Sequence, residues 1–314
     1  MTLSRYWPSA AGLALGYLAD QVFGDPHRGH PVAAFGAAAS WLESRCYADR
    51  QAAGLLHTAV LVGSAVGLGV VLEQSIGNRS RASILATALA TWTVLGGRSL
   101  SQEAATIAQQ LAGGKLHAAR EQVRHLVGRE TAQLSTEEVA RATVESLAEN
   151  SSDAVVAPLL WGAVAGLPGL LGYRAVNTLD AMIGHRSARY RRFGWSAARL
   201  DDLVNWIPAR LAALATAAWA PLVGGTAGGA IGAVRRSAGR HPSPNAGVIE
   251  AAFAGALDVR LGGRNVYHGT PEDRGILGDG RPVQVADIAR ARRLATAVSV
   301  SVLIIAVLLR GWRS

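Results

Sequence analysis

The stretch Glu145-Ser146-Leu147-Ala148-Glu149-Asn150-Ser151-Ser152-Asp153 separates two unlike parts of the chain. The residues before it follow the pattern of a charged amphipathic helix, whereas the run Ala154–Gly172 after it contains no charged residue. Carboxylates and amides at the mouth of a membrane segment cost free energy unless they have a partner. The stretch therefore indicates a membrane-embedded fold and is the first place to look for chemistry.

The composition supports a membrane protein. Of the 314 residues, 50% are hydrophobic and 17% are charged, whereas a soluble domain has about 25% charged residues. Lipid-exposed backbone must satisfy its own hydrogen bonds within a helix or a closed barrel. We therefore expect an all-α polytopic integral membrane protein with about five or more membrane segments and amphipathic helical loops, and we do not expect strands.

The segments expected to enter the membrane differ in strength. Ala52–Leu72 meets the length and composition of a span, Leu203–Val234 is longer but broken by Pro208 and Pro221, and Leu294–Leu309 is short but uncharged; the weaker candidates are Ile84–Gly97 and Trp7–Gly24. A further segment, Ala154–Gly172, contains Pro158, Pro168 and several glycines, and the polar stretches on both of its sides are rich in arginine. Positive charge favours the cytoplasmic side, so we expect this segment to be broken or re-entrant.

Two polar regions interrupt the apolar chain. Residues 98–153 predict an insert of helices, with a break at Gly113-Gly114 and a capping box at Ser135-Thr136-Glu137-Glu138. Residues 235–293 predict a second polar loop, of which 262–282 is glycine-rich and irregular. We treat residues 1–314 as a single membrane-embedded domain that contains both regions.

The last helix of the insert places charged residues at successive i,i+4 positions on one face, namely Glu137, Arg141, Glu145 and Glu149. A solvated ladder of ion pairs explains the first two and is one interpretation of Glu145. Glu149 differs, because Asn150 and Asp153 follow it directly before the apolar run. We therefore assign these last three to a site.

The N-terminal polar loop, residues 20–31, is stiffened by prolines that follow Asp25 and His30. It is either a plain interfacial loop or a contact for a phosphate or carboxylate through His27, Arg28 and His30. The sequence leaves both interpretations open.

Polar residues with helical spacing follow the broken segment. Arg174, Asn177 and Asp180 are three residues apart and share one edge of a helix. Asp202 and Asn205 repeat this spacing at the start of the next apolar segment, where Asp201 and Asp202 could instead cap that helix. These residues are therefore candidate ligands or caps.

The turn Gly239–Gly247 contains two prolines and leads through Ser243 and Asn245 into an expected helix, Val248–Leu257. Backbone amides at a helix N-terminus bind anions well. The alternative is a capping turn without a ligand.

Several common sites are absent from the sequence. There is no G-x-x-x-x-G-K-[ST], no H-E-x-x-H and no G-x-S-x-G, and Cys46 is the single cysteine. Basic residues are not interleaved with aromatics, so nucleic acid is not an expected partner. Hard oxygen ligands are abundant, which favours Mg²⁺ if a metal is used.

Taken together, these motifs resemble the CobD/CbiB family of cobalamin biosynthesis, the adenosylcobinamide-phosphate synthases. The resemblance runs from about Leu15 to the final apolar segment, whereas the Arg120–Thr131 stretch and the C-terminal tail carry no motif. The matching stretches are Gly24-Asp25-Pro26, His30-Pro31-Val32, Glu149-Asn150-Ser151-Ser152-Asp153, Tyr173-Arg174-Ala175-Val176-Asn177-Thr178-Leu179-Asp180, Arg199-Leu200-Asp201-Asp202-Leu203-Val204-Asn205-Trp206-Ile207-Pro208-Ala209-Arg210 and His241-Pro242-Ser243-Pro244-Asn245-Ala246-Gly247.

The resemblance implies an ATP-dependent ligase that joins adenosylcobyric acid to (R)-1-amino-2-propanol or its O-phosphate. Mg²⁺ and ATP are then expected, with the corrinoid as substrate. The residues expected to be catalytic are Glu149, Asn150, Asp153, Asn177, Asp180 and Asp202, with Glu149, Asp153 and Asp180 also as metal ligands. The residues expected to bind substrate or phosphate are Asp25, His30, Arg98, Arg174, Asn205, Ser243 and Asn245.

The resemblance also implies a multi-pass protein of the cytoplasmic membrane, with its active site on the cytoplasmic face and other cobalamin-pathway enzymes as partners. Two other classes stay open. A transporter would place carboxylates inside the spans, whereas here they lie at the ends. A non-catalytic sensor or regulator on the same fold would be expected to lose the Asn and Asp positions, which this chain has.

Overall fold

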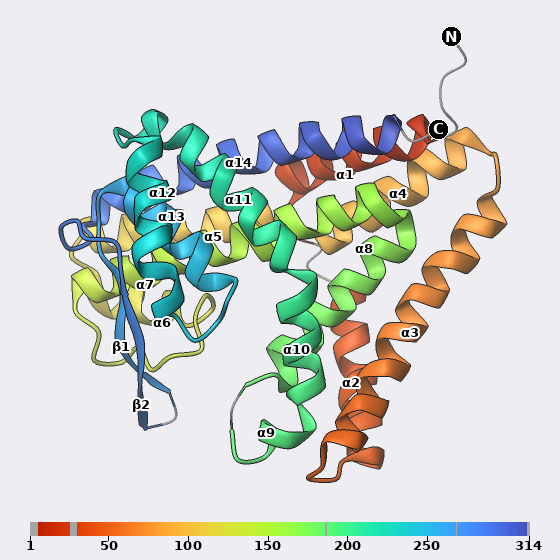
Figure 1. Cartoon of the computed structure of the whole chain (residues 1–314), viewed down its shortest axis with the longest axis horizontal. Coiled ribbons are helices and arrows are strands. Elements are labelled where there is room, and N and C mark those ends of the chain that lie inside the picture. The colour runs from red at the N-terminus through yellow and green to blue at the C-terminus, as the bar shows by residue number, and fades with distance from the viewer. Residues whose placement is uncertain (1–5, 26–29, 186, 268, 313–314) are drawn as a thin grey trace. The chain divides into compact units, whose positions relative to one another are not determined.

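The structure, a computed structural model, describes residues 6–25, 30–185, 187–267 and 269–312. Helices make up most of the described chain (Figure 1). The chain divides into two compact units, each assembled from segments that are discontinuous in sequence.

The first unit contains the N-terminal helices, the helices that follow residue 156, and the end of the last helix from Leu303 onward. Its elements are α1 (Trp7–Phe23), α2 (Pro31–Cys46), α3 (Gln51–Ile76), α4 (Ser80–Val94), α8 (Ala157–Ile183), α9 (Tyr190–Phe193), α10 (Trp195–Val204) and the last turns of α14 (Val285–Gly311). One apolar cluster of this unit surrounds the fully buried Phe193 and Leu179.

The second unit contains the polar insert and most of the C-terminal part. Its elements are α5 (Gly97–Ala112), α6 (Leu116–Val123), α7 (Thr136–Ser151), the π-helical segment η1 (Ser152–Val156), α11 (Trp206–Trp219), η2 (Ala220–Val223), α12 (Ala227–Ser237), η3 (Ala238–Arg240), α13 (Ala246–Leu257), β1 (Leu261–Tyr267), β2 (Thr270–Leu277) and α14 as far as Val302. The apolar helix α13 packs against α7, α11 and α12, and its Phe253 and Leu257 are fully buried.

In the described part of the chain, four helical stretches are long and apolar enough to cross a membrane: Gln51–Ile76, Thr136–Ile183, Trp206–Val223 and Val285–Gly311. The first has a mean hydropathy of 2.1, yet only 22% of its apolar window is buried within the protein. Exposed apolar side chains of that kind are what lipid contact requires. The predicted polytopic helical membrane fold is confirmed.

The predicted segment Leu203–Val234 is divided at Pro221, one of the two prolines expected to break it. Its apolar helix ends with η2, where Pro221 is followed by Gly224 in the left-handed conformation, and α12 starts only at Ala227. The weaker segments form α1 and α4, which are shorter than a span and pack on each other. A methyl group on Gly12 or Gly16 of α1 would clash with α4, which is the close backbone approach typical of membrane helices.

The expected break in the apolar run after Asp153 is confirmed within α8. Gly166 has φ 64° and ψ −142°, and Pro168 follows it. Figure 1 shows the sharp bend in α8. A methyl group added to Gly162 would meet the side chain of Leu170 from the second half of the helix. The amide of Leu167, freed by the break, donates to Glu73 Oε1 at 3.0 Å, so a side chain from α3 satisfies the start of the second half of α8.

Replacing Gly166 by alanine is expected to destabilise the protein strongly. The added methyl group would meet the Glu73 carboxylate and Arg310 Nη2, at 2.7 Å, and a positive φ disfavours any side chain. Thermal unfolding in detergent measures the effect. Gly63→Ala is the matched control, because a methyl group there meets nothing within 4 Å and the φ is helical. Equal melting temperatures for the two variants would contradict this account of the break.

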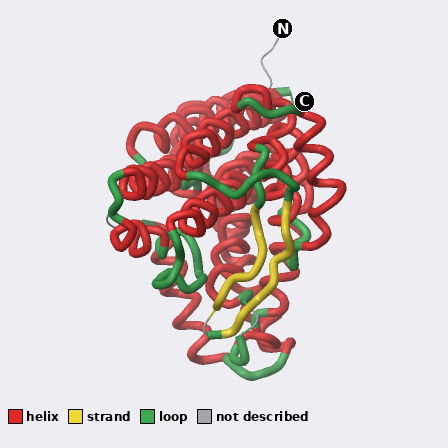
Figure 2. Tube along the Cα trace, turned by 90° about the vertical axis from the view of Figure 1, so that its left-hand side faces the viewer, coloured by secondary structure: helices red, strands yellow, loops and turns green. Residues whose placement is uncertain are grey.

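The polar insert folds as the sequence indicates, but the second polar region does not. Ser135 and Glu138 form the predicted capping box at the start of α7, and Gly113-Gly114 separates α5 from α6. The expectation that strands are absent is wrong, since β1 and β2 form an antiparallel hairpin (Figure 2). The glycines that suggested irregular chain lie at its bulge, between Gly262 and Arg264, and near its ends.

Candidate functional site

The predicted site residues fall into two groups, one in each unit. Glu149, Asn150, Asp153, Arg98, Ser243 and Asn245 belong to the second unit, and Asp25, His30, Arg174, Asn177, Asp180, Asp202 and Asn205 belong to the first. That the two groups form one site stays a prediction. His27 and Arg28 lie outside the described residues.

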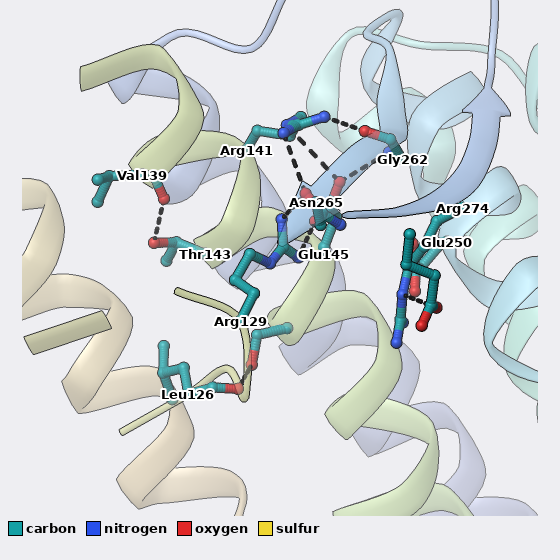
Figure 3. Close-up of polar contacts among 12 residues, drawn as sticks. Leu126, Arg129, Val139, Arg141, Thr143, Glu145, Glu250, Gly262, Asn265 and Arg274 are labelled. Atoms are coloured by element: carbon teal, nitrogen blue, oxygen red, sulfur yellow. Dashed lines mark hydrogen bonds and ion pairs between the residues drawn. The ribbon is translucent and has the colours of Figure 1, made fainter. Parts of the chain in front are cut away.

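A buried network of ionic and hydrogen bonds fixes α7 to the β-hairpin in the second unit (Figure 3). Glu145 forms an ion pair with Arg129, and their side chains are 5% and 6% exposed. The other oxygen of Glu145 accepts a hydrogen bond from the Gly262 amide at 2.7 Å. Arg129 also donates to Asn265 Oδ1 at 2.9 Å, and Arg141 donates to the Gly262 carbonyl.

This network corrects the interpretation of the charged face of α7 as a solvated ladder. Glu137 is exposed, as expected, but Arg141 is only 18% exposed and Glu145 is buried. The reason is that β1 covers this face of the helix, which the spacing of charges along α7 cannot reveal. Along this face of α7, the charged side chains therefore change from exposed at Glu137 to buried at Glu145.

A second group of charged side chains lies beside this network. Glu250 of α13 and His241 are 4% and 1% exposed, with 3.8 Å between Glu250 Oε1 and His241 Nε2. Arg274 Nη1 of β2 lies 3.4 Å from the same ring nitrogen, and its guanidinium stacks over Tyr267 at 5.0 Å. Figure 3 shows Arg274 next to Glu250.

The surroundings of Glu250 and His241 favour the neutral carboxylic acid and the neutral imidazole. Burial raises the pKa of Glu250 well above its ordinary value, and the negative charges of Glu145 and Glu149 add to this rise. Burial lowers the pKa of His241, and the positive charge of Arg274 lowers it further. Each ring nitrogen of His241 also faces a donor, the Ser243 amide or Arg274. We therefore assign a neutral pair at 3.8 Å rather than an ion pair.

The lowered pKa of His241 predicts a pH-dependent contribution to stability. Below about pH 6.5 the unfolded chain binds a proton that the folded imidazole resists, so stability falls as the pH falls from there. The raised pKa of Glu250 has the opposite effect on the pH dependence of stability. A His241→Asn variant keeps Glu250, so comparing it with the wild type isolates the contribution of His241. Between about pH 7.5 and about pH 5, unfolding in detergent should show a steeper loss for the wild type. Parallel curves for the two proteins would contradict this assignment.

Glu149, Asn150 and Asp153 lie where α7 passes into the π-helical segment η1. Such single turns of π-helix occur frequently at functional sites. The amide of Asn150 donates to the backbone oxygen and the hydroxyl of Ser146, both at 3.0 Å. Glu149 is partly exposed and experiences the charges of Arg274, Arg129 and Glu145. The stretch identified first in the sequence therefore borders the charged group.

Hydrogen bonds to the Ser243 side chain hold the turn before α13. Ser243 Oγ accepts hydrogen bonds from the amides of Asn245 and Ala246, at 3.3 and 3.2 Å. Asn245 Oδ1 accepts from Arg210 Nη1 at 2.9 Å. These amides are thus occupied within the protein, and the predicted role of Ser243 and Asn245 in phosphate binding stays a prediction. Arg98 is exposed in the first turn of α5.

The first unit brings some of its predicted residues together. Arg174 Nη1 lies 3.4 Å from Asn177 Oδ1 on α8, and Asp25 acts on Arg174 electrostatically. Asp180 follows one turn later on the same helix, as the spacing predicted. Asp25 and α8 thus meet at this cluster.

The remaining predicted residues of this unit have mainly structural contacts. Asn205 is 1% exposed and accepts a hydrogen bond from the Tyr173 hydroxyl at 2.9 Å. Asp202 pairs with Arg199 at 3.3 Å in an exposed i,i+3 pair. Asp202 lies in the last turn of α10 and not at the start of α11, which corrects its expected place as a cap. His30 accepts from the Val32 amide and caps α2.

Sequence reasoning missed Arg129, Glu250 and Arg274. The stretch that contains Arg129 carries no motif, yet its side chain neutralises the buried Glu145. Glu250 did have a signal, because it is the only charged residue in the apolar helix α13. A lone acid in such a helix requires a partner or a raised pKa.

Comparison with known proteins places the chain in a family. A family model described as CobD/Cbib protein matches residues 13–295. The chain belongs to the CobD/CbiB family. Its relatives include proteins named Cobalamin biosynthesis protein CobD, and that of Mycobacterium tuberculosis is 51% identical over 309 residues, or 98% of each chain. Those of Geobacter metallireducens and Rhodobacter capsulatus are 44% and 42% identical, covering 83% and 89% of this chain and 84% and 90% of their own. No solved structure matches the chain.

This CobD/CbiB chain lacks a preformed cage for a metal within residues 6–25, 30–185, 187–267 and 269–312. No three His, Cys, Asp or Glu side chains there are grouped so as to hold an ion. Of the predicted ligands, Glu149 and Asp153 belong to one unit and Asp180 to the other. One or two carboxylates nevertheless suffice for a Mg²⁺ that arrives on substrate phosphates, and Glu149 and Asp153 fit that requirement.

Proposed function

We propose that this chain acts in cobalamin biosynthesis as an ATP-dependent amide-forming enzyme. It would join a carboxyl side chain of adenosylcobyric acid to the amine of (R)-1-amino-2-propanol O-phosphate, or of the free amino alcohol. The observation that carries the proposal is the charged group around Glu149, Glu250 and Arg274 in a CobD/CbiB chain. It offers both an anion contact, Arg274, and a proton acceptor, Glu149, at the motif that carries the resemblance.

The reaction needs an activated carboxyl group and a neutral amine. A carboxylate is a poor acyl donor, so transfer of the γ-phosphoryl group of ATP to it gives an acyl phosphate and ADP. The amine then attacks the acyl carbon, phosphate leaves, and a base takes the proton that the amine loses. Phosphoryl transfer depends mostly on positioning and on neutralising charge.

The residues of the second unit suit these steps. Arg274 is 25% exposed and presents a guanidinium beside Glu149, where a carboxylate or phosphate of a substrate would be held. Glu149 is partly exposed and would hold the ammonium group and accept its proton. The neutral His241–Glu250 pair lies behind Arg274, whose Nε also pairs with Glu272 Oε1 at 3.3 Å.

Magnesium would enter with ATP and would neutralise the phosphate charge during transfer. Glu149 and Asp153 are the residues of this unit that would contact it. Arg174, Asn177, Asp180 and Asp25 of the first unit are the proposed second set of substrate contacts, with a positive charge available for a phosphate.

We also propose that the protein resides in the cytoplasmic membrane with this site facing the cytoplasm, where ATP is available. The polar segments between the apolar helices are rich in arginine, which supports this orientation. Other enzymes of cobalamin biosynthesis are the expected partners, since the corrinoid must be delivered to it and the product taken up.

The proposal is tested with the purified chain in lipid nanodiscs. Adenosylcobyric acid, the amino-alcohol phosphate, MgATP and protein should together yield the amide, ADP and phosphate in equal amounts, detected by mass spectrometry and a coupled ADP assay. Omission of ATP should abolish the product. A folded wild-type preparation that forms no amide with either amino alcohol would refute the proposed function.

A further inference from the structure

The β-hairpin of the second unit borders two adjoining grooves that the mechanism above does not use. One has a volume of about 790 Å³ and is lined by Arg240, Gly263, Arg264, Asp273, Gly275 and Ile276. The other has a volume of about 590 Å³ and lies between the hairpin and the start of α7. They share Gly263, Arg264 and Ile276. Both volumes are in the range of small-molecule sites, which is about 300–1,000 Å³.

In the described part of the chain, the arginines that line these grooves keep N–H groups that donate no hydrogen bond. Within the described part of the chain, Arg260 and Arg264 form no side-chain hydrogen bond or ion pair, and both are exposed. Arg240 donates from one nitrogen to the Ile276 carbonyl at 3.4 Å and keeps its other donors. Guanidinium groups bind phosphate in a bidentate manner. The groove therefore presents three arginines without an acidic partner of their own.

The acids of the grooves are largely engaged with the backbone. Asp273 Oδ1 accepts from the Gly275 amide at 2.9 Å, and Glu138 accepts from the Ser135 amide at 2.8 Å as part of the capping box. Glu137 stands exposed at the outer end of α7. Arg141 lines the second groove as well, so four arginines face three acids across the two grooves.

One short segment of backbone, Gly262-Gly263, lies between the grooves and the buried network of Glu145 and Arg129. Gly263, with φ 85°, forms the bulge of β1 and lines both grooves. The amide of its neighbour Gly262 donates a hydrogen bond to Glu145 in the buried network, and the carbonyl of Gly262 accepts one from Arg141, which lines the second groove. An added side chain at Gly263 would meet Arg141 Nη1 at 3.1 Å. The bulge thus places the backbone of Gly263 and the side chain of Arg141 together on the wall of the second groove.

We propose that these grooves bind the triphosphate of a nucleoside triphosphate through Arg240, Arg260 and Arg264. The inference rests on the proposed function, which needs ATP in a chain without a phosphate-binding glycine loop. Several unengaged arginines spread over two joined grooves match a chain of linked phosphates, whereas a single phosphate would use one arginine pair. Glu137 at the rim offers a carboxylate to the magnesium that accompanies the nucleotide.

The test uses the full chain in nanodiscs with trinitrophenyl-ATP and Mg²⁺ as a fluorescent probe. Arg264→Gln is expected to raise the Kd of the probe, and the KM for ATP, about tenfold, as loss of a charge-assisted phosphate contact does. The KM for the amino-alcohol phosphate should stay within twofold. Arg260→Gln should act in the same direction. Arg235→Gln, an exposed arginine of α12 outside both grooves, is the matched control and should leave the Kd unchanged.

The outcomes separate this inference from the proposed function. Tight probe binding that Arg264→Gln weakens, in a wild type that forms no amide, would support the groove and refute the function. If the wild type forms the amide, but the probe Kd of Arg264→Gln and of Arg260→Gln stays within twofold of that of Arg235→Gln, nucleotide binding by the groove is refuted and the proposed function is not. A wild type that does not bind the probe also refutes it. Displacement of the probe by the amino-alcohol phosphate at lower concentration than by ATP would overturn the nucleotide assignment.

Discussion

Replacing Glu145 by alanine is expected to lower the free energy of unfolding by about 3–5 kcal/mol, the usual cost of removing one partner of a buried ion pair. Its side chain is 5% exposed, and the Arg129 guanidinium, 6% exposed, would be left buried without its counter-charge. The Gly262 amide would also lose its acceptor. Because these contacts tie α7 to the hairpin, the second unit should lose both helix packing and strand register.

The measurement is equilibrium unfolding in mixed detergent micelles, followed by circular dichroism. Glu137→Ala, on the same face of α7 but exposed, is the control and should change stability by less than about 0.5 kcal/mol. Restoring neutrality with a Glu145→Ala, Arg129→Met double variant should recover part of the loss, since no unpaired charge then remains. A single variant as stable as the control would show that the pair contributes nothing to the fold.

Replacing Glu149 by glutamine is expected to reduce kcat for amide formation by about 10²–10⁴-fold, the range for loss of a positioned general base. Glutamine keeps the size and the hydrogen-bonding capacity of the side chain but cannot accept the proton of the ammonium group. Glu149 is partly exposed and forms no ion pair within the described part of the chain, so stability should change little compared with Glu145→Ala.

The assay for the amide product described above measures this effect, with melting temperature as the check on folding. A base also leaves a signature in the pH profile, whose acidic limb should be lost in Glu149→Gln. Glu121→Gln, at an exposed acid of α6 outside both grooves, is the control and should keep full activity. A kcat within threefold of wild type would remove Glu149 from the site.

Much of the fold was predictable because the relevant signals are local. The apolar run 52–72 predicted α3, and the capping box at Ser135 predicted the start of α7. Pro168 and the glycines before it predicted the break in α8, since neither residue supports a continuous helix. In each case the residues that decide the conformation lie within a few positions of one another.

The β-hairpin shows where that reasoning fails. Its glycines suggested irregular chain, but the bulge between Gly262 and Arg264 is stabilised by Glu145, which lies far away in sequence. The same distance hid the partner of Glu145, because Arg129 precedes α7 in a stretch without a motif. Spacing along a helix shows which charges share a face, and says nothing about what covers that face.

The sequence by itself therefore determined the membrane class, the family resemblance and the choice of Glu149, Asn150 and Asp153 as candidate site residues, because each depends on composition or on adjacent residues. Only the tertiary structure decided that Glu250 and Arg274 lie beside them and that Glu145 is a buried structural charge. The physical reason is that a charge removed from water needs a partner. That partner is chosen by the packing of α7, α13 and the hairpin, not by position in the chain.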